Sequence, residues 1–140
     1  MKKLGLLFGV LIILVVSGCS TNNVESGKQN KESVPDCVVS NDLNSAYSLT
    51  IIANREEIDN KEEFAKLLIE RVRNNDFKTI MFSYDVKGYP VGLQMSVYLS
   101  EKAWQDRKKE PNMNISFEQE SIVNGYNFVD DYDKFELKID

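Results

Sequence analysis

Residues 91–100 alternate strictly between apolar and less apolar side chains, and this pattern constrains the fold more than any other in the chain. The apolar members are Val91, Leu93, Met95, Val97 and Leu99. Successive side chains of a strand point to opposite faces of a sheet, so one face of this strand is buried and the other is solvated. We therefore expect a sheet that is covered by a second layer on one side only.

Residues 60–75 carry the pattern of a helix that provides this cover. Asn60 and Glu63 have the spacing of a capping residue and its partner, and Asn74 and Asn75 are expected to end the helix. Four apolar side chains fall on one helical face: Phe64, Leu67, Leu68 and Val72.

Four further segments are rich in β-branched, aromatic or alternating apolar residues and are expected as strands: 46–53, 77–85, 113–117 and 135–139. A short turn at 87–90 predicts that 77–85 and 91–99 form an antiparallel hairpin, with 77–85 in the centre of the sheet. A short helix is expected within 100–110, and the Asn124-Gly125 pair is typical of a tight turn. The order β-α-β-β-β-β predicts a two-layer α+β domain, with one amphipathic helix on a mostly antiparallel sheet of roughly four to six strands.

The N-terminus has the layout of a secretory signal peptide. Lys2 and Lys3 precede the uncharged run 4–16, and the small residues Ser17 and Gly18 follow it. This apolar run is too short for a membrane-spanning helix, which needs about 20 residues. We therefore expect export of the rest of the chain.

The segment Val16-Ser17-Gly18-Cys19 resembles a bacterial lipobox, although Val16 stands where Leu is commoner. The resemblance covers residues 1–20. It implies cleavage between Gly18 and Cys19, and a diacylglycerol on Cys19 that holds the protein at the extracytoplasmic face of the cell membrane. Two acyl chains anchor a protein stably, whereas one does not.

The expected organisation is a signal peptide at 1–18, a lipidated N-terminus with a flexible polar tether at 19–43, and an α+β domain at 44–140. Cleavage removes Lys2 and Lys3 and no acidic residue, so the formal net charge moves from −5 to −7. An acidic domain of this kind is not expected to bind nucleic acid. Cys37 falls in the predicted tether as an unpaired thiol, because Cys19 is already modified.

Groups that carry common chemistry are scarce. The chain has no histidine and one cysteine besides Cys19, so catalytic triads and zinc sites are not expected, nor is any other cofactor. An alternative is a small hydrolase of the cell wall that uses paired carboxylates, with Asp85, Glu118 and Glu120 as candidates. The acidic run 130–133 lacks the glycine and glutamate spacing of a calcium loop and is expected to be a solvated turn.

Two aromatic residues are candidates for partner binding: Trp104, in the charged segment 100–111, and Tyr89, in the predicted turn. The alternative, which the usual burial of tryptophan favours, is that Trp104 folds back onto the domain as a lid over the sheet edge. In overall layout the chain resembles small lipoproteins of Gram-positive bacteria, some of which exclude redundant conjugative transfer or give immunity to a peptide antibiotic. The predicted function is therefore binding or occlusion of an envelope partner, without catalysis.

Overall fold

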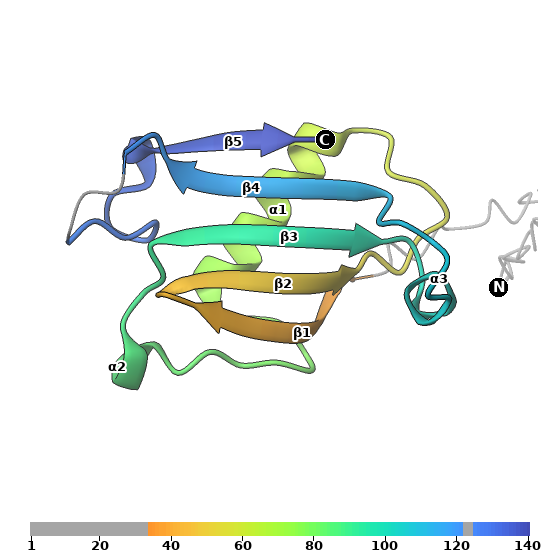
Figure 1. Cartoon of the computed structure of the whole chain (residues 1–140), viewed down its shortest axis with the longest axis horizontal. Coiled ribbons are helices and arrows are strands. Elements are labelled where there is room, and N and C mark those ends of the chain that lie inside the picture. Colours follow the sequence, from red (N-terminus) through yellow and green to blue (C-terminus); the bar gives the residue numbers. More distant parts are fainter. Residues whose placement is uncertain (1–33, 122–124) are drawn as a thin grey trace, which may run out of the picture.

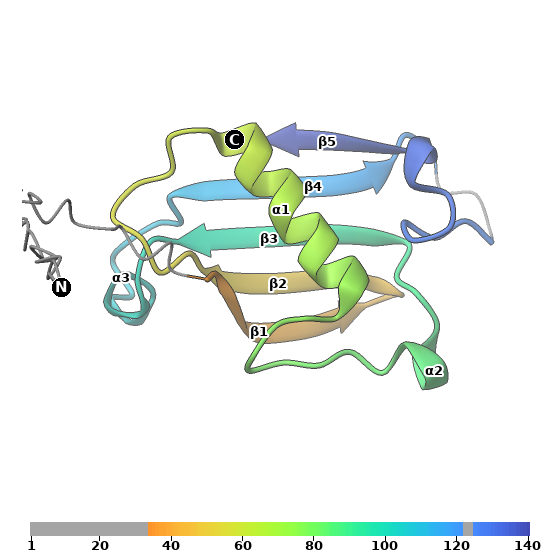
Figure 2. The same ribbon diagram turned by 180° about the vertical axis from the view of Figure 1, so that it is seen from behind.

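Within the residues that the structure describes, one face of a five-stranded sheet carries a single long helix, and no helix covers the other face (Figures 1 and 2). The computed structural model describes residues 34–121 and 125–140. The strands lie in the order β1-β2-β3-β4-β5. Their bounds are β1 Asp36–Leu43, β2 Ala46–Ile52, β3 Gly92–Tyr98, β4 Met113–Gln119 and β5 Phe135–Ile139. The helices are α1 Lys61–Asn74, α2 Tyr84–Lys87, α3 Glu101–Gln105 and a 3₁₀ turn at Tyr132–Lys134.

The expected two-layer α+β fold is confirmed. The apolar members of the alternating segment, from Leu93 to Val97, are buried on the side of the sheet that faces α1. Burying apolar side chains between the two layers supplies most of the stabilisation of such a domain. From α1, the buried side chains are Phe64, Ala65, Leu68, Ile69 and Val72. Leu67, predicted on this buried face, is instead 41% exposed.

The predicted ends of the long helix are also confirmed. The Asn60 side-chain oxygen accepts a hydrogen bond from the Glu63 N–H at 3.0 Å, which satisfies a backbone donor of the first turn. Asn75 ends the helix in the left-handed conformation, with a φ of 55°. The strands expected at 113–117 and 135–139 correspond to β4 and β5, which pair in antiparallel register.

The prediction of a strand at 77–85 is wrong. This segment is irregular up to the short helix α2, and β3 pairs in parallel with β2 and in antiparallel register with β4. The 91–99 strand therefore has no hairpin partner at 77–85. A parallel neighbour needs a long crossover connection, which here consists of α1 and the segment that follows it.

The fifth strand comes from the predicted tether, so the expected boundary between residues 43 and 44 is also wrong. β1 covers residues 36–43 and pairs with β2 through a turn at Asn44 and Ser45, whose φ angles are 54° and 70°. Positive φ at both central residues matches the twist of a two-residue hairpin. Cys37 is fully buried in β1 and belongs to the core.

The predicted Asn124-Gly125 turn lies partly outside the described residues, because Asn124 is not among them. The connection between β4 and β5 spans residues 120–134 and includes the 3₁₀ turn. Phe128, in this connection, is fully buried and packs edge-on against Phe117 of β4.

Candidate functional site

Four exposed apolar side chains lie on α2, within three residues of it in the chain, or at the end of β1 beside it, and we call them the α2 patch. They are Leu43, Met81, Val86 and Tyr89, with exposed fractions of 57%, 75%, 79% and 40%. Only two other large apolar side chains of the described residues are as exposed, Val34 and Leu67. Scattered exposed apolar residues are normal on a protein surface, but several near one short helix suggest an interaction site.

A stack of aromatic rings connects this surface to the core. The Phe82 ring lies 5.0 Å from the ring of Tyr47 on β2 and 5.6 Å from the ring of Tyr84, the first residue of α2. The Tyr84 ring is in turn 4.9 Å from the ring of Tyr89. Offset aromatic pairs add to the stability of the packing. The Tyr89 ring is therefore held by a series of ring contacts that extends to Tyr47 of β2.

Hydrogen bonds to the end of α1 fix the same segment. The side-chain amide of Asn75 accepts from the Phe82 N–H at 2.7 Å and donates to the Phe82 C=O at 2.8 Å. The Tyr84 hydroxyl donates to the Val72 C=O at 2.6 Å. Burial raises the pKa of Tyr84 above its usual value of 10.0, so its hydroxyl remains a donor even in mildly alkaline solution.

Within the α2 patch, Val86 on α2 and Leu43 lie at the end of the sheet remote from the first described residue. Met81 lies between the two ends, two residues after Thr79, whose N–H donates to the Asp36 carboxylate. The Lys87 ammonium is 3.5 Å from the Asp42 carboxylate, so α2 lies beside the β1–β2 turn (Figure 1). Val34 lies near the other end, where its C=O accepts from the Asn54 side chain at 2.9 Å. The seven residues of β2 separate these ends by roughly 20 Å.

The two predicted aromatic candidates are not brought together. Tyr89 precedes β3 and belongs to the α2 patch, whereas Trp104 lies on α3, which follows β3 at the other end of the sheet (Figure 1). Trp104 is half-buried, not fully exposed. Of this patch, the sequence pointed to Tyr89 alone. Met81 falls in the predicted central strand 77–85, where its side chain would be buried, and Val86 lies between that segment and the predicted turn at 87–90.

The three carboxylates of the hydrolase alternative do not converge. Asp85 lies on α2, at the β1 side of the molecule, whereas Glu118 lies on β4, near the opposite edge (Figure 1). Glu118 accepts a hydrogen bond from Gln94 at 2.8 Å and stands opposite Glu136 of β5. Glu120 follows the end of β4 and is exposed.

The buried thiol of Cys37 has the properties of a core residue. Burial and the neighbouring Asp36 charge raise the pKa of Cys37 to about 12, so the reactive thiolate is scarcely populated at neutral pH. Within residues 34–121 and 125–140, no three His, Cys, Asp or Glu side chains are grouped so that they could hold a metal ion.

A groove of about 520 Å³ lies at the N-terminal half of α1, near Val34 and Pro35. The guanidinium of Arg55 lies 4.4 Å above the Phe64 ring there, in cation–π geometry. Arg55 and Arg71 line the groove together with Asp59 and Glu63, so opposite charges face it. This mixture of charges selects no class of ligand.

The predicted signal peptide, the Gly18–Cys19 cleavage site and the lipidation site lie outside the described residues. No helix within the described part of the chain is long and apolar enough to span a bilayer. Comparisons of the chain with protein-family models, curated proteins and solved structures found no match.

Proposed function

We propose that this chain is an exported lipoprotein, anchored through a diacylglycerol on Cys19, whose domain binds a protein of the cell envelope through the α2 patch. The lipobox-like segment 16–19 supports the anchor. The observation that carries the binding function is the exposure of Met81 and Val86 on a segment that the rest of the domain holds in place. A preformed surface of this kind binds without a large ordering cost.

The chemistry of the patch defines the partner that it fits. Its exposed side chains are two aliphatic residues, a methionine and a tyrosine, and the ion pair of Lys87 and Asp42 lies directly beside Val86 and Leu43 in the chain. Such a surface suits an uncharged apolar region on the extracytoplasmic part of another protein. Because α2 is remote from Val34, the first described residue, we expect the α2 end of the patch to face away from the anchor.

A photo-crosslinking amino acid at position 86 in the full chain tests the proposal in intact cells. We expect one dominant cross-linked envelope protein, and at least a tenfold loss of this product, on the order expected for one binding anchor, when Tyr89→Ala is added. The matched control is Leu67→Ala, which removes an apolar side chain of similar exposure from another surface. An undiminished product in the Tyr89→Ala chain contradicts a role for the α2 patch.

The same experiment separates a protein partner from a lipid surface. Cross-linking of position 86 to lipid alone, with no protein product, contradicts the proposed partner. The Trp104→Ala chain tests the second predicted anchor, and we expect its cross-linked product to match that of the unmodified chain.

Cys19→Ala tests the anchor independently of the binding surface. We expect this variant to leave the membrane fraction or to persist as an uncleaved precursor. Normal processing and unchanged fractionation contradict lipidation at Cys19.

A further inference from the structure

Strand β5 forms one edge of the sheet, and the outward backbone groups of two of its residues have no partner among the described residues. The outward N–H of Phe135 is already bonded to the Tyr132 C=O. Asn114 and Asp140 exchange both of their backbone hydrogen bonds, at 3.3 and 3.0 Å. In antiparallel pairs, hydrogen-bonded residues alternate with residues whose N–H and C=O groups point the other way. The N–H and C=O groups of Leu137 and Ile139 therefore point away from β4, and within the described part of the chain they make no hydrogen bond.

The charged side chains along this edge are placed so that two antiparallel copies of β5, centred on Leu137, would bring opposite charges together. Glu136 and Lys138 project from the open face of the sheet, and their charged groups are 3.1 Å apart within one strand. If two copies of β5 paired in antiparallel register about a two-fold axis at Leu137, each Glu136 would stand directly opposite the Lys138 of the other copy. These two symmetric pairs would occupy non-hydrogen-bonded positions, where side chains are closest.

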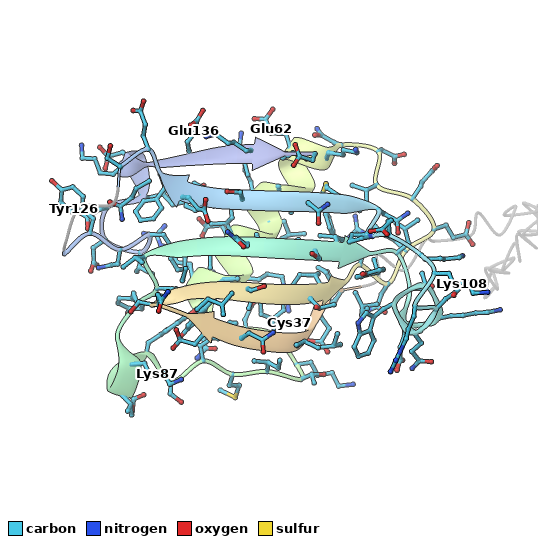
Figure 3. All side chains as sticks on the ribbon, viewed as in Figure 1. Cys37, Glu62, Lys87, Lys108, Tyr126 and Glu136 are labelled. Atoms are coloured by element: carbon cyan, nitrogen blue, oxygen red, sulfur yellow. The ribbon has the colours of Figure 1, made fainter. Side chains whose placement is uncertain are left out.

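A second copy also relieves an unfavourable neighbour within the monomer. Glu136 stands directly opposite Glu118 on β4, and like charges in this position repel. Lys138 of the second copy would add a positive charge on the free side of Glu136. Figure 3 shows Glu136 at the margin of the sheet formed by β5, where nothing in the described part of the chain covers it.

The other edge of the sheet does not offer the same pairing. β1 has an irregular register between Cys37 and Val39, and the segment after α1 lies along it (Figures 1 and 2). The Asp36 carboxylate accepts hydrogen bonds from the Lys78 and Thr79 N–H groups of that segment, at 2.9 and 3.1 Å. Bulges and covering segments are common ways in which proteins block an edge strand.

We propose that two copies of this chain associate through antiparallel pairing of their β5 strands about Leu137, which joins their sheets into one. The two sides of this contact are the same surface, so the association closes as a two-fold dimer and does not continue into a filament. The central bonds run between the two Leu137 residues. The Ile139 N–H of each copy donates to the Phe135 C=O of the other. This proposal is independent of the α2 patch, which lies at the opposite margin of the sheet.

The register of the pairing is tested with two full-length variants, Glu136→Cys and Lys138→Cys, expressed separately and together in the same cells and treated with copper–phenanthroline. Positions 136 and 138 of different copies are directly opposite, with Cα atoms about 4.5 Å apart, within the range of a disulfide. Two copies of position 136 are offset by two residues and lie roughly 8 Å apart, beyond that range. We therefore expect a disulfide-linked dimer from the mixture and little or none from either variant alone.

The matched control places the same pair of cysteines on the other edge, as Asn41→Cys and Leu43→Cys in β1, and we expect no dimer from this mixture. A dimer that forms equally well from the single variants and from the mixture overturns the proposal, because such cross-links arise from random collisions between molecules and not from one fixed register. Absence of a dimer from the 136 and 138 mixture overturns it as well. A disulfide from position 136 to a different envelope protein also overturns it, since the edge then receives a strand of another chain.

Charge exchange provides a second measurement that needs no cysteine. Glu136→Lys in the full chain turns two attractive pairs into two repulsive ones, and we expect the dimer dissociation constant in detergent to rise about tenfold by sedimentation equilibrium. The double variant Glu136→Lys with Lys138→Glu restores the opposite pairs, and we expect it to return to within about twofold of the unmodified chain. Equal dissociation constants for all three chains overturn the proposal. We expect the single substitution to leave folding intact, because a lysine at position 136 stands opposite Glu118 and attracts it.

Discussion

The two edge strands of the sheet, β1 and β5, differ in how far pairing with a further strand is blocked. β1 is bulged and lies beneath the segment that connects α1 to α2, and the Asp36 carboxylate binds this segment. β5 has five residues in regular register and carries Glu136 and Lys138 on its open face. An exposed edge invites pairing, and proteins limit it by covers, bulges, charges or short strands. β1 has a cover and a bulge, whereas β5 has neither among the described residues, and its two opposite charges can complement a second copy of the strand.

This difference determines what each margin can contribute to function. The cover of β1 is itself held by aromatic stacking and hydrogen bonds, and it carries Met81 and leads into α2, beside which the rest of the α2 patch lies. The margin at β5 presents backbone groups and paired charges. Apolar patches select partners by shape, whereas a free edge selects another strand. The two margins are therefore suited to two different associations.

The largest expected effect comes from removing the aromatic support of the β1 cover. Phe82→Ala deletes a ring that is 8% exposed and stacks on both Tyr47 and Tyr84. We expect a loss of about 3–4 kcal/mol in the free energy of unfolding, measured by urea titration, because a buried ring leaves a cavity.

The matched substitution on the other margin is Leu137→Ala, which shortens a half-buried side chain of β5. We expect a loss of about 1 kcal/mol, since less apolar surface is taken from water there. Equal losses for the two variants contradict the view that the cover of β1 is an integral part of the core.

A smaller effect is expected from the side chain that joins the cover to α1. Asn75→Gly keeps the left-handed conformation at the end of the helix but removes both hydrogen bonds to Phe82. We expect a loss of about 1–2 kcal/mol in the free energy of unfolding and faster hydrogen exchange at the Phe82 amide. Asn75→Ala adds the cost of a positive φ and is expected to be less stable than Asn75→Gly by about 1 kcal/mol.

The margins also differ in how far they follow from the sequence. β5 was predicted because Phe135, Leu137 and Ile139 alternate with charged residues, and α1 because both of its caps and its apolar face lie within one local stretch. Local periodicity is sufficient for such elements.

The β1 margin depends instead on contacts between distant parts of the chain. Phe77, Ile80 and Phe82 have the composition of a strand, but β2 already pairs with β1 and β3. Residues 36–43 are predicted as part of the tether, but they form β1. Residues 36–43 and 77–85 both have strand character, and residues 36–43 take the place beside β2. The composition of either segment alone does not show which of the two will pair.

The same limit applies to the candidate site. Tyr89 was identified as an aromatic residue in a turn, and the structure places it in the α2 patch. Met81 and Val86 have no distinctive signal of their own. Their exposure results from the way in which Asn75 and Tyr84 hold the segment against the end of α1.

The smallest expected effect concerns the carboxylate that holds the cover to β1, and it depends on pH. Partial burial acts to raise the pKa of Asp36, but hydrogen bonds from Thr79 and Lys78 outweigh it and lower the pKa below the usual value of 3.8. A carboxyl group with a lowered pKa stabilises the fold above its unfolded value, and this stability is lost as the pH falls through the folded value. Asp36→Asn removes the charge and is expected to cost about 1 kcal/mol at pH 7, after allowance for screening by solvent.

The difference between the unmodified chain and Asp36→Asn should therefore shrink as the pH falls below about 4, and vanish once Asp36 is protonated in both states. The measurement is the free energy of unfolding by urea titration at pH 7 and at several values down to pH 2. The control on the other margin is Asp133→Asn. Its carboxylate is fully exposed, and its pKa is lowered by the hydrogen bond and charge of Lys134. Solvent screens such a pair, so we expect no measurable change at any pH. If Asp133→Asn matches Asp36→Asn across the range, the stabilisation comes from surface charge in general and not from the contact between Asp36 and the cover of β1.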